Sequence, residues 1–433
     1  MKLSNRPQKL IVFGLTLLAF LLRAYRLDTQ SYWIDEAWTV YYANLSPDKL
    51  WHVLQTSRLV PPLYHFLTLY WSRLAGDGEY ALRFCSLVFG VMAVPFTYRL
   101  GKALKDDRLA LLIALLMTCA PYQIWHSQDA RNYSMLTAAS AMSMWGFINM
   151  WQRGGWRWRL IYIVGTEWAI MIHYHGVVII GIQGLFLLLA WRRHWRDYLV
   201  WGSTLVIIFL LFVPWLVSGL NLLQSYLNWI EQPTLWDSYI RSAIAYSVGE
   251  LVPRPQAIPL TLAFVAIYAL GLFYASRRAW GIWRGYEMVG LLVAYTIAPN
   301  LAAWLYGQIR TPVYMERYLI FVQVGYLLTV AMGVLAVADG LRRRLAWGGP
   351  VLAGIVALLP LGIDGWVLSH HYFDPAYAKP DWRATAHTIE DFGLPTDAIV
   401  ITGDGNEKLL SFYYQGTLPI LSLIHISEPT RPY

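Results

Sequence analysis

Two adjacent carboxylates in an apolar part of the chain are the first residues whose types suggest chemistry. Asp35 and Glu36 lie among aromatic residues in SYWIDEAWTV, residues 31–40, soon after the apolar run IVFGLTLLAFLL. Ionisable groups at membrane depth cost roughly 2.5–3.5 kcal/mol each on insertion scales, so they normally face a bundle interior or a water-filled cavity. Three later stretches add further candidates: Asp129, Arg131 and Tyr133 in IWHSQDARNYSML, His173 and His175 in IHYHG, and Arg310 and Arg317 in QIRTPVYMERYLIF.

Taken singly, each of these residues has an ordinary structural interpretation. Asp35 and Glu36 suit a solvated loop or a helix cap, Asp129 with Arg131 suits a surface ion pair, and Arg317 suits a helix-end anchor. Taken together, they suit the removal of a group from a lipid-linked phosphate. A carboxylate can take the proton of an acceptor hydroxyl, while guanidinium groups bind phosphate bidentately.

The composition indicates a polytopic membrane protein. Of 433 residues, 57% are hydrophobic and only 14% are charged, whereas soluble domains carry about a quarter charged residues. The 22 tryptophans and 29 tyrosines suit membrane–water interfaces. Cys85 and Cys119 lie in apolar segments and cannot form a disulfide framework. The first apolar run has no small-residue cleavage site, so we interpret it as an uncleaved span.

Apolar runs long enough to cross a bilayer predict eleven transmembrane helices. Their expected ranges are 9–26, 80–101, 109–125, 133–151, 160–174, 176–191, 198–218, 258–275, 286–306, 317–338 and 350–368. The short segment 61–76 is assigned as an interfacial helix, because six cytoplasmic segments then receive three Lys or Arg each. The N-terminus is then cytoplasmic, and every candidate residue lies on the outer side of the cytoplasmic membrane. The net charge of +8 reflects this sorting and gives no sign of nucleic-acid binding.

The polar C-terminal stretch differs in composition from the rest. We expect residues 1–368 to form the transmembrane domain, with functional outer loops at 27–79 and 126–132. Residues 369–420 combine an amphipathic helix pattern with the strand-like AIVITG, which predicts the start of a small, truncated α/β domain outside the membrane. The last residues, 421–433, do not continue this pattern and are interpreted as a non-native tail.

An ordered series of motifs resembles the GT-C superfamily of lipid-phosphate-sugar-dependent glycosyltransferases. The series is IDEAW, then PPLYHFLTLYWSRLAGDGEYALRFCSLVFG, SQDARNYSML, HYHG, ERYLIF and DWRATA, spread over residues 9–415. It is similar to the group of protein O-mannosyltransferases and lipid A aminoarabinose transferases, family 39-like. The resemblance implies a GT-C transmembrane bundle and an inverting transfer of sugar from a polyprenyl phosphate to a protein, lipid or other glycan acceptor.

The resemblance also implies roles for individual residues. Asp35 would be the catalytic carboxylate, supported by Glu36, and Asp129 would assist the acceptor or a metal. The chemistry of the guanidinium group makes Arg131, Arg317 and Arg310 the candidates for the donor phosphate. The remaining substrate-binding candidates are Tyr133, His173 and His175.

Other interpretations of the same residues stay open. No closed set of cysteine or histidine ligands predicts a structural metal, but Asp35, Asp129 and His175 could hold Mg²⁺ or Mn²⁺. A transporter of lipid-linked sugars would need functional polar groups at mid-membrane, where Glu167 and the Pro299-Asn300 break are the candidates. A catalytically inactive glycolipid-binding scaffold is the third interpretation, and the intact acidic residues argue against it.

Overall fold

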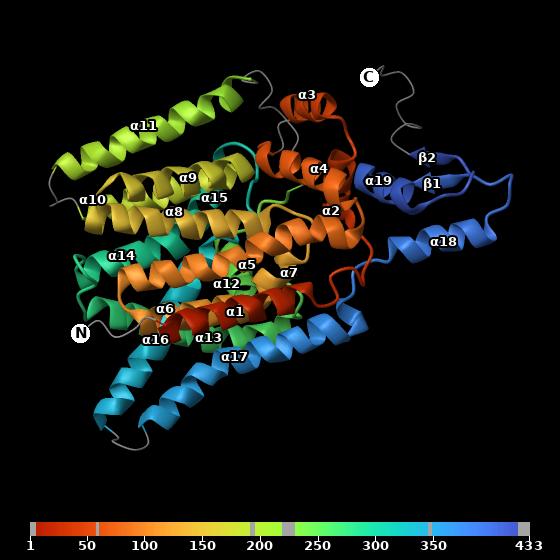
Figure 1. Ribbon diagram of the computed structural model, residues 1–433. Coiled ribbons are helices and arrows are strands. Elements are labelled where there is room, and N and C mark those ends of the chain that lie inside the picture. The colour runs from red at the N-terminus through yellow and green to blue at the C-terminus, as the bar shows by residue number, and fades with distance from the viewer. Residues whose placement is uncertain (1–5, 58–59, 191–194, 219–229, 345–348, 423–433) are drawn as a thin grey trace.

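The computed structural model describes residues 6–57, 60–190, 195–218, 230–344 and 349–422. Long helices run side by side in one bundle, and a small α/β unit lies beyond one end of it (Figure 1). The first half contains α1 (Arg6–Ala24), α2 (Ile34–Ala43), α3 (Pro47–Ser57), α4 (Leu63–Ala75), α5 (Glu79–Leu104), α6 (Asp107–Cys119), α7 (Pro121–Ser127), α8 (Tyr133–Arg153), α9 (Trp156–Ile172), η1 (Tyr174–Gly176), α10 (Val177–Leu189) and α11 (Trp195–Val217). The second half contains α12 (Leu235–Val248), α13 (Arg254–Ser276), α14 (Gly285–Thr296), α15 (Ala298–Ile309), η2 (Glu316–Leu319), α16 (Val322–Arg344), α17 (Gly349–Phe373), η3 (Pro375–Tyr377), α18 (Trp382–Phe392), β1 (Ile399–Ile401), α19 (Asp404–Tyr413) and β2 (Ile420–Ser422).

Helices occupy all eleven predicted spans. Among the described residues, five helices are long and apolar enough to cross a membrane, namely α1, α5, α11, α13 and α16. The number rises to seven if the bent pairs α6–α7 and α14–α15 each count as one span. The chain is therefore a multi-pass membrane protein with the predicted helical class, while the count of eleven stays a prediction.

Prolines account for the two bends. The angle between α6 and α7 is 57°, and Pro121 is the first residue of α7. Proline excludes its predecessor from the helical region, and Ala120 accordingly has ψ 115°. The angle between α14 and α15 is 44°, with Pro299 in the first turn of α15. The first bend sets the direction of α7, which leads directly into the turn that carries Asp129.

Glycines let α8 and α9 approach closely. A Cβ atom added at Gly146 would lie 2.6 Å from the backbone nitrogen of Tyr162, and one added at Gly165 would lie 2.5 Å from that of Ser143. Small residues at such crossings are typical of membrane helix pairs. The contact fixes the end of α8 that carries Tyr133 relative to the end of α9 that precedes His173.

The segment between α1 and α5, predicted to lie outside the membrane, is largely helical. Residues 61–76, predicted as an interfacial helix, contain α4, whose 13 residues span about 20 Å and fall short of a hydrocarbon core of about 30 Å. Helix α4 packs against α2, α5 and α9. Helix α2 begins at Ile34, so Asp35 and Glu36 occupy the first turn of a helix. From the sequence alone, a solvated loop and a helix cap were both possible for these two residues.

The C-terminal unit packs directly on α2. Strands β1 and β2 pair in parallel with Ile399 opposite Ile420, and α19 connects them. The predicted amphipathic helix and the strand in AIVITG are therefore both present. Leu409 of α19 is buried in one cluster with Tyr32 and Ala37, and Tyr413 packs against it. Of the predicted non-native tail, residues 423–433 lie outside the described residues.

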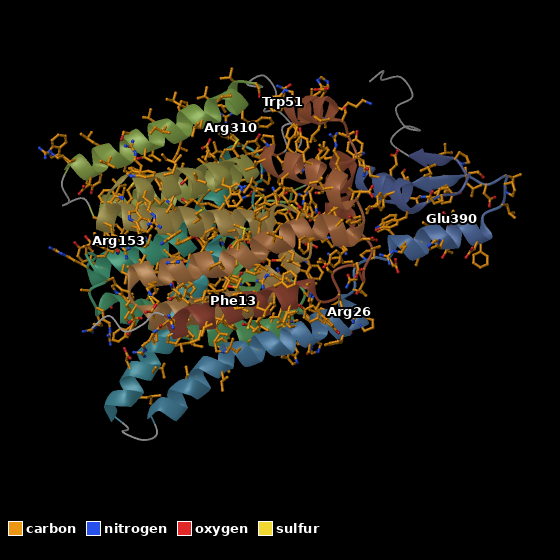
Figure 2. All side chains as sticks on the ribbon, in the orientation of Figure 1. Phe13, Arg26, Trp51, Arg153, Arg310 and Glu390 are labelled. Atoms are coloured by element: carbon orange, nitrogen blue, oxygen red, sulfur yellow. The ribbon has the colours of Figure 1, made fainter. Side chains whose placement is uncertain are left out.

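We expect the two ends of the bundle to face opposite sides of the membrane. Arg153 lies at one end, and Arg26 and Glu390 lie at the other (Figure 2). Single cysteines replacing Asp77 and Thr402 should therefore react with an impermeant thiol reagent on intact cells, after both native cysteines are changed to serine. A cysteine replacing Asp106 should react only after the membrane is permeabilised. External labelling at position 106 would overturn the predicted orientation.

Candidate active site

Asp35 projects from the first turn of α2 toward the segment that follows α15. Its Oδ2 lies 3.2 Å from Nη2 of Arg317, which belongs to η2. The Asp35 side chain is 20% exposed and that of Arg317 is 16% exposed. The pair is therefore sheltered but reachable, as a proton acceptor for a bound substrate must be.

Arg131 adds a second guanidinium beside this pair. Its Nη2 donates to the hydroxyl of Tyr133 over 3.4 Å, and its carbonyl accepts from Oγ of Ser86 over 2.8 Å. Burial lowers the pKa of Arg131, but Tyr133 and Asp35 outweigh burial, so the pKa stays above its ordinary value and the group stays charged. Among the described residues, Nε of Arg131 and Nε of Arg317 are buried without a hydrogen-bond acceptor.

Aromatic rings form a wall beside the two arginines. The rings of Tyr133 and Tyr318 lie 6.3 Å apart, and Tyr318 also contacts His173 at 4.8 Å and His175 at 5.4 Å. Nδ1 of His173 accepts from the backbone N–H of His175, whose own Nε2 lies 3.1 Å from the carbonyl oxygen of Val313. The predicted binding residues from three separate segments therefore meet in one place.

Glu36 is buried and fully engaged by the protein. Its carboxylate accepts hydrogen bonds from Nε and Nη2 of Arg83 over 2.8 and 2.7 Å. Oε1 also accepts a hydrogen bond from the backbone N–H of Ala130 over 2.7 Å. Oε2 accepts from the backbone N–H of Trp33 over 3.3 Å. Glu36 thus joins α2 to α5 and to the turn after α7. Its geometry suits the supporting role that the resemblance implies.

Asp129 is fully buried in a second cluster. One carboxylate oxygen pairs with Nζ of Lys379 and accepts from Nε1 of Trp33 over 3.2 Å, and the other lies 3.4 Å from Nδ1 of His126. Burial raises the pKa of Asp129, but Lys379 and then His126 outweigh burial and hold that pKa well below its ordinary value. Both causes favour the charged carboxylate of Asp129, and Lys379 balances that charge.

Arg310 is the third arginine predicted for the donor phosphate. It follows Ile309 at the end of α15 and is exposed. In the described part of the chain it makes no ion pair with Asp35 or Asp129, so its place in the phosphate site stays a prediction.

Comparisons with known proteins decide the fold. Residues 60–217 match the family described as dolichyl-phosphate-mannose-protein mannosyltransferase. No curated protein matches the sequence at a significant level. The apo structure of ArnT from Cupriavidus metallidurans matches with a TM-score of 0.63 at 14% identity, over 94% of this chain and 85% of that chain. The chain has the GT-C glycosyltransferase fold.

Two ligand-bound GT-C structures match equally well. ArnT from C. metallidurans bound to undecaprenyl phosphate gives a TM-score of 0.62 at 16% identity, over 98% of this chain and 89% of that one. The oligosaccharyltransferase AglB from Archaeoglobus fulgidus, in complex with an inhibitory peptide and a dolichol phosphate, gives 0.63 at 13% identity, over 95% and 64%. The resemblance to GT-C glycosyltransferases that the motifs indicated is thus confirmed.

Two charged residues of this GT-C site escaped the sequence analysis. Arg83 lies near the start of the predicted span 80–101, and an arginine within an apolar helix signals a buried partner, which proves to be Glu36. Lys379 lies in the polar C-terminal stretch, where one lysine among many charged residues gives no signal of its own.

The structure does not bring Asp35, Asp129 and His175 together as the divalent-cation site that the sequence left possible. Among the described residues, no three His, Cys, Asp or Glu side chains form a group that could hold a metal. The physical reason is that the Asp129 carboxylate is already occupied by Lys379 and Trp33, while His175 contacts the carbonyl of Val313. These three residues do not fit a cation in this arrangement.

Proposed function

We propose that this GT-C protein is an inverting glycosyltransferase. It moves a sugar from a polyprenyl-phosphate donor to an envelope acceptor, a protein, a lipid A-type glycan or another glycan, at the outer face of the cytoplasmic membrane. The observation that carries the proposal is a reachable carboxylate, Asp35, beside two arginines that each keep a buried Nε without an acceptor. The matched family and the lipid phosphates named with ArnT and AglB support the same donor class.

The arrangement divides the reaction between two kinds of side chain. Arg131 and Arg317 would bind the phosphate and stabilise the charge that grows as the bond from anomeric carbon to phosphate oxygen breaks. That bond's electron pair leaves with the phosphate. Asp35 would take the proton of the acceptor hydroxyl as its oxygen attacks the anomeric carbon from the opposite face. The aromatic wall of Tyr133 and Tyr318 would pack against the sugar or the first isoprene unit.

Purified protein in liposomes, supplied with a polyprenyl-phosphate sugar labelled in the sugar, tests this function. We expect the label to pass to a glycan or protein acceptor from a bacterial envelope extract, with free polyprenyl phosphate as the second product and an inverted anomeric centre by NMR.

Transfer in the presence of a chelator should match that with Mg²⁺ or Mn²⁺, because Asp129 and His175 are held by protein partners. Movement of intact donor between leaflets without release of polyprenyl phosphate would instead identify a transporter.

A further inference from the structure

We propose that Lys379, which follows the last membrane helix, is a positioning residue that assembles the site, and that Asp129 is its anchor and does not contact the acceptor. This inference rests on the proposed function, because it concerns the same site. Three observations carry it: the contacts of the Lys379 ammonium, the hydrogen bonds of the segment around it, and the enclosure of the Asp129 carboxylate.

The Lys379 ammonium is enclosed by the two segments that carry the reactive residues. Its Nζ pairs with Oδ1 of Asp129, and the Lys379 side chain is only 8% exposed. The ammonium lies 5.2 Å from the ring of Trp33 and 4.7 Å from that of Trp125, distances at which a cation is attracted by an aromatic face. Nε1 of Trp33 donates to the same Oδ1. One lysine therefore joins the residue before α2 to the turn after α7.

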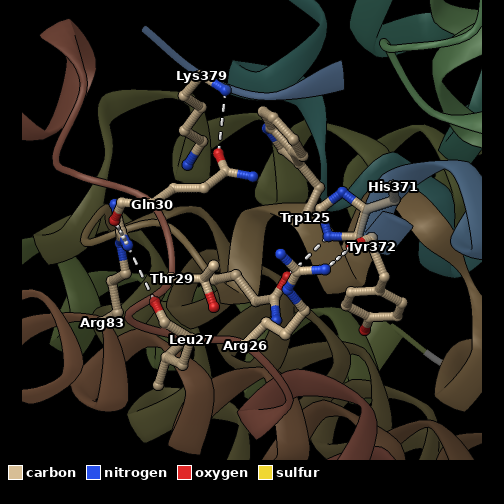
Figure 3. A pocket seen from close by; sticks show the side chains of 10 residues that line it. Arg26, Leu27, Thr29, Gln30, Arg83, Trp125, His371, Tyr372 and Lys379 are labelled. Atoms are coloured by element: carbon tan, nitrogen blue, oxygen red, sulfur yellow. Dashed lines mark hydrogen bonds between the residues drawn. The ribbon is translucent and has the colours of Figure 1, made fainter. Parts of the chain in front are cut away.

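The backbone around Lys379 is held by hydrogen bonds to residues that lie just before α2. The Lys379 N–H donates to Oε1 of Gln30 over 3.0 Å (Figure 3). Oγ of Ser31 donates to the carbonyl of Pro380 over 3.1 Å and accepts from the N–H of Trp382 over 2.9 Å. The lysine is therefore presented by an ordered segment and does not reach Asp129 from a free tail.

Both residues that Lys379 links stand next to the proposed machinery. Trp33 is the residue before the first turn of α2, two positions ahead of Asp35. Asp129 is two positions ahead of Arg131, and its carbonyl accepts from the Arg131 N–H over 2.7 Å. A shift of the Asp129–Lys379 pair would therefore change the relation between the proton acceptor and a phosphate-binding arginine.

The enclosure of Asp129 argues against direct contact with an acceptor. Its side chain has no exposed surface, and both oxygens face protein groups, with Lys379 and Trp33 at one and His126 at the other. A buried carboxylate that loses its only close lysine is left as an uncompensated charge, which destabilises its surroundings strongly. Removing both partners of the pair should disturb the turn less than removing one.

A double-mutant cycle on the liposome assay tests the inference. We expect Lys379→Met to lower the transfer rate about 100-fold and Lys379→Arg to restore it to within about fivefold of the parent, because an arginine can still pair with the carboxylate. Asp129→Asn should also lower the rate, but the double variant Asp129→Asn/Lys379→Met should be at least tenfold faster than Lys379→Met. Lys49→Met, at an exposed lysine of α3, is the matched control and should equal the parent.

Each outcome of the cycle supports or overturns the inference. If Asp129 contacts the acceptor, the double variant will be as slow as the slower single variant, and Lys379→Arg will not restore transfer. If Lys379→Met transfers at the parental rate, Lys379 positions nothing and the inference is wrong. A parent protein that releases no polyprenyl phosphate would refute the proposed function itself, which separates the two failures. Size-exclusion profiles of all variants in detergent report whether each one folds. If Lys379→Met aggregates, Lys379→Arg carries the decision, because its rate is compared directly with that of the parent.

Discussion

Asp35→Asn is expected to lower the rate of sugar transfer by about 10²–10⁴-fold, the range in which a general base contributes to catalysis. Asparagine keeps the shape of the side chain and its capacity to accept a hydrogen bond, but it cannot take the acceptor proton. Asp35 is partly exposed at the start of α2 and pairs with Arg317, which lies outside the Glu36 and Asp129 clusters, so the substitution leaves the buried clusters intact. The measurement is the initial rate of polyprenyl-phosphate release at saturating donor.

Asp28→Asn is the matched control for this experiment. Asp28 is an exposed carboxylate in the same outer segment, and we expect its variant to transfer sugar like the parent. The affinity for donor should change little in Asp35→Asn, because the proposed phosphate contacts come from the arginines. A parental rate in Asp35→Asn would show that another group accepts the proton.

Arg317→Lys is expected to reduce kcat/KM for the donor by about 10–100-fold. Lysine keeps the positive charge but loses the planar fork that binds two phosphate oxygens at once. Hydrogen bonds to charged groups contribute about 1.5–3 kcal/mol, and each 1.4 kcal/mol corresponds to a factor of ten. Because Nε of Arg317 is buried without an acceptor, the lost donor is one that the phosphate would otherwise satisfy. The effect should appear in donor titrations of the liposome assay.

Arg310→Lys provides the comparison at a nearby arginine. Arg310 is exposed and, within the described residues, forms no ion pair with Asp35, so we expect its variant to keep donor kinetics within about twofold of the parent. Equal losses in both variants would return Arg310 to the phosphate site. Normal kinetics in Arg317→Lys, with the protein folded, would make Arg317 a membrane anchor only.

The helices were predictable from sequence because their signal is local. Apolar runs located a helix at each expected span, and the order of the motifs indicated the GT-C fold. The positions of Asp35, Arg131 and Arg317 on one side of the bundle also followed, because alternation of membrane sides assigns their segments to the same end.

The partners of the buried acids could not be predicted in the same way. Glu36 and Asp129 look alike in sequence as carboxylates in outer segments, yet one is held by Arg83 and the other by Lys379. These pairings depend on the packing of helices that are distant in the chain, and no periodicity encodes them. For the same reason Asp129 was considered with Asp35 and His175 as a possible ligand of one cation. In the structure its carboxylate instead pairs with Lys379 of the C-terminal segment.

The contact between Lys379 and Asp129 has a consequence for the order in which the site matures during synthesis. Glu36 meets Arg83 once the first two membrane helices have been made, whereas Lys379 is added 250 residues after Asp129. At about 5–20 residues per second, that interval lasts roughly 12–50 s. Until Lys379 is in place, the Asp129 carboxylate, which lies in the same turn as Arg131, lacks the positive charge that balances it. We therefore expect the position of Arg131 to be poorly fixed in the nascent protein. The protein should become competent for sugar transfer only when the last outer segment has crossed the membrane.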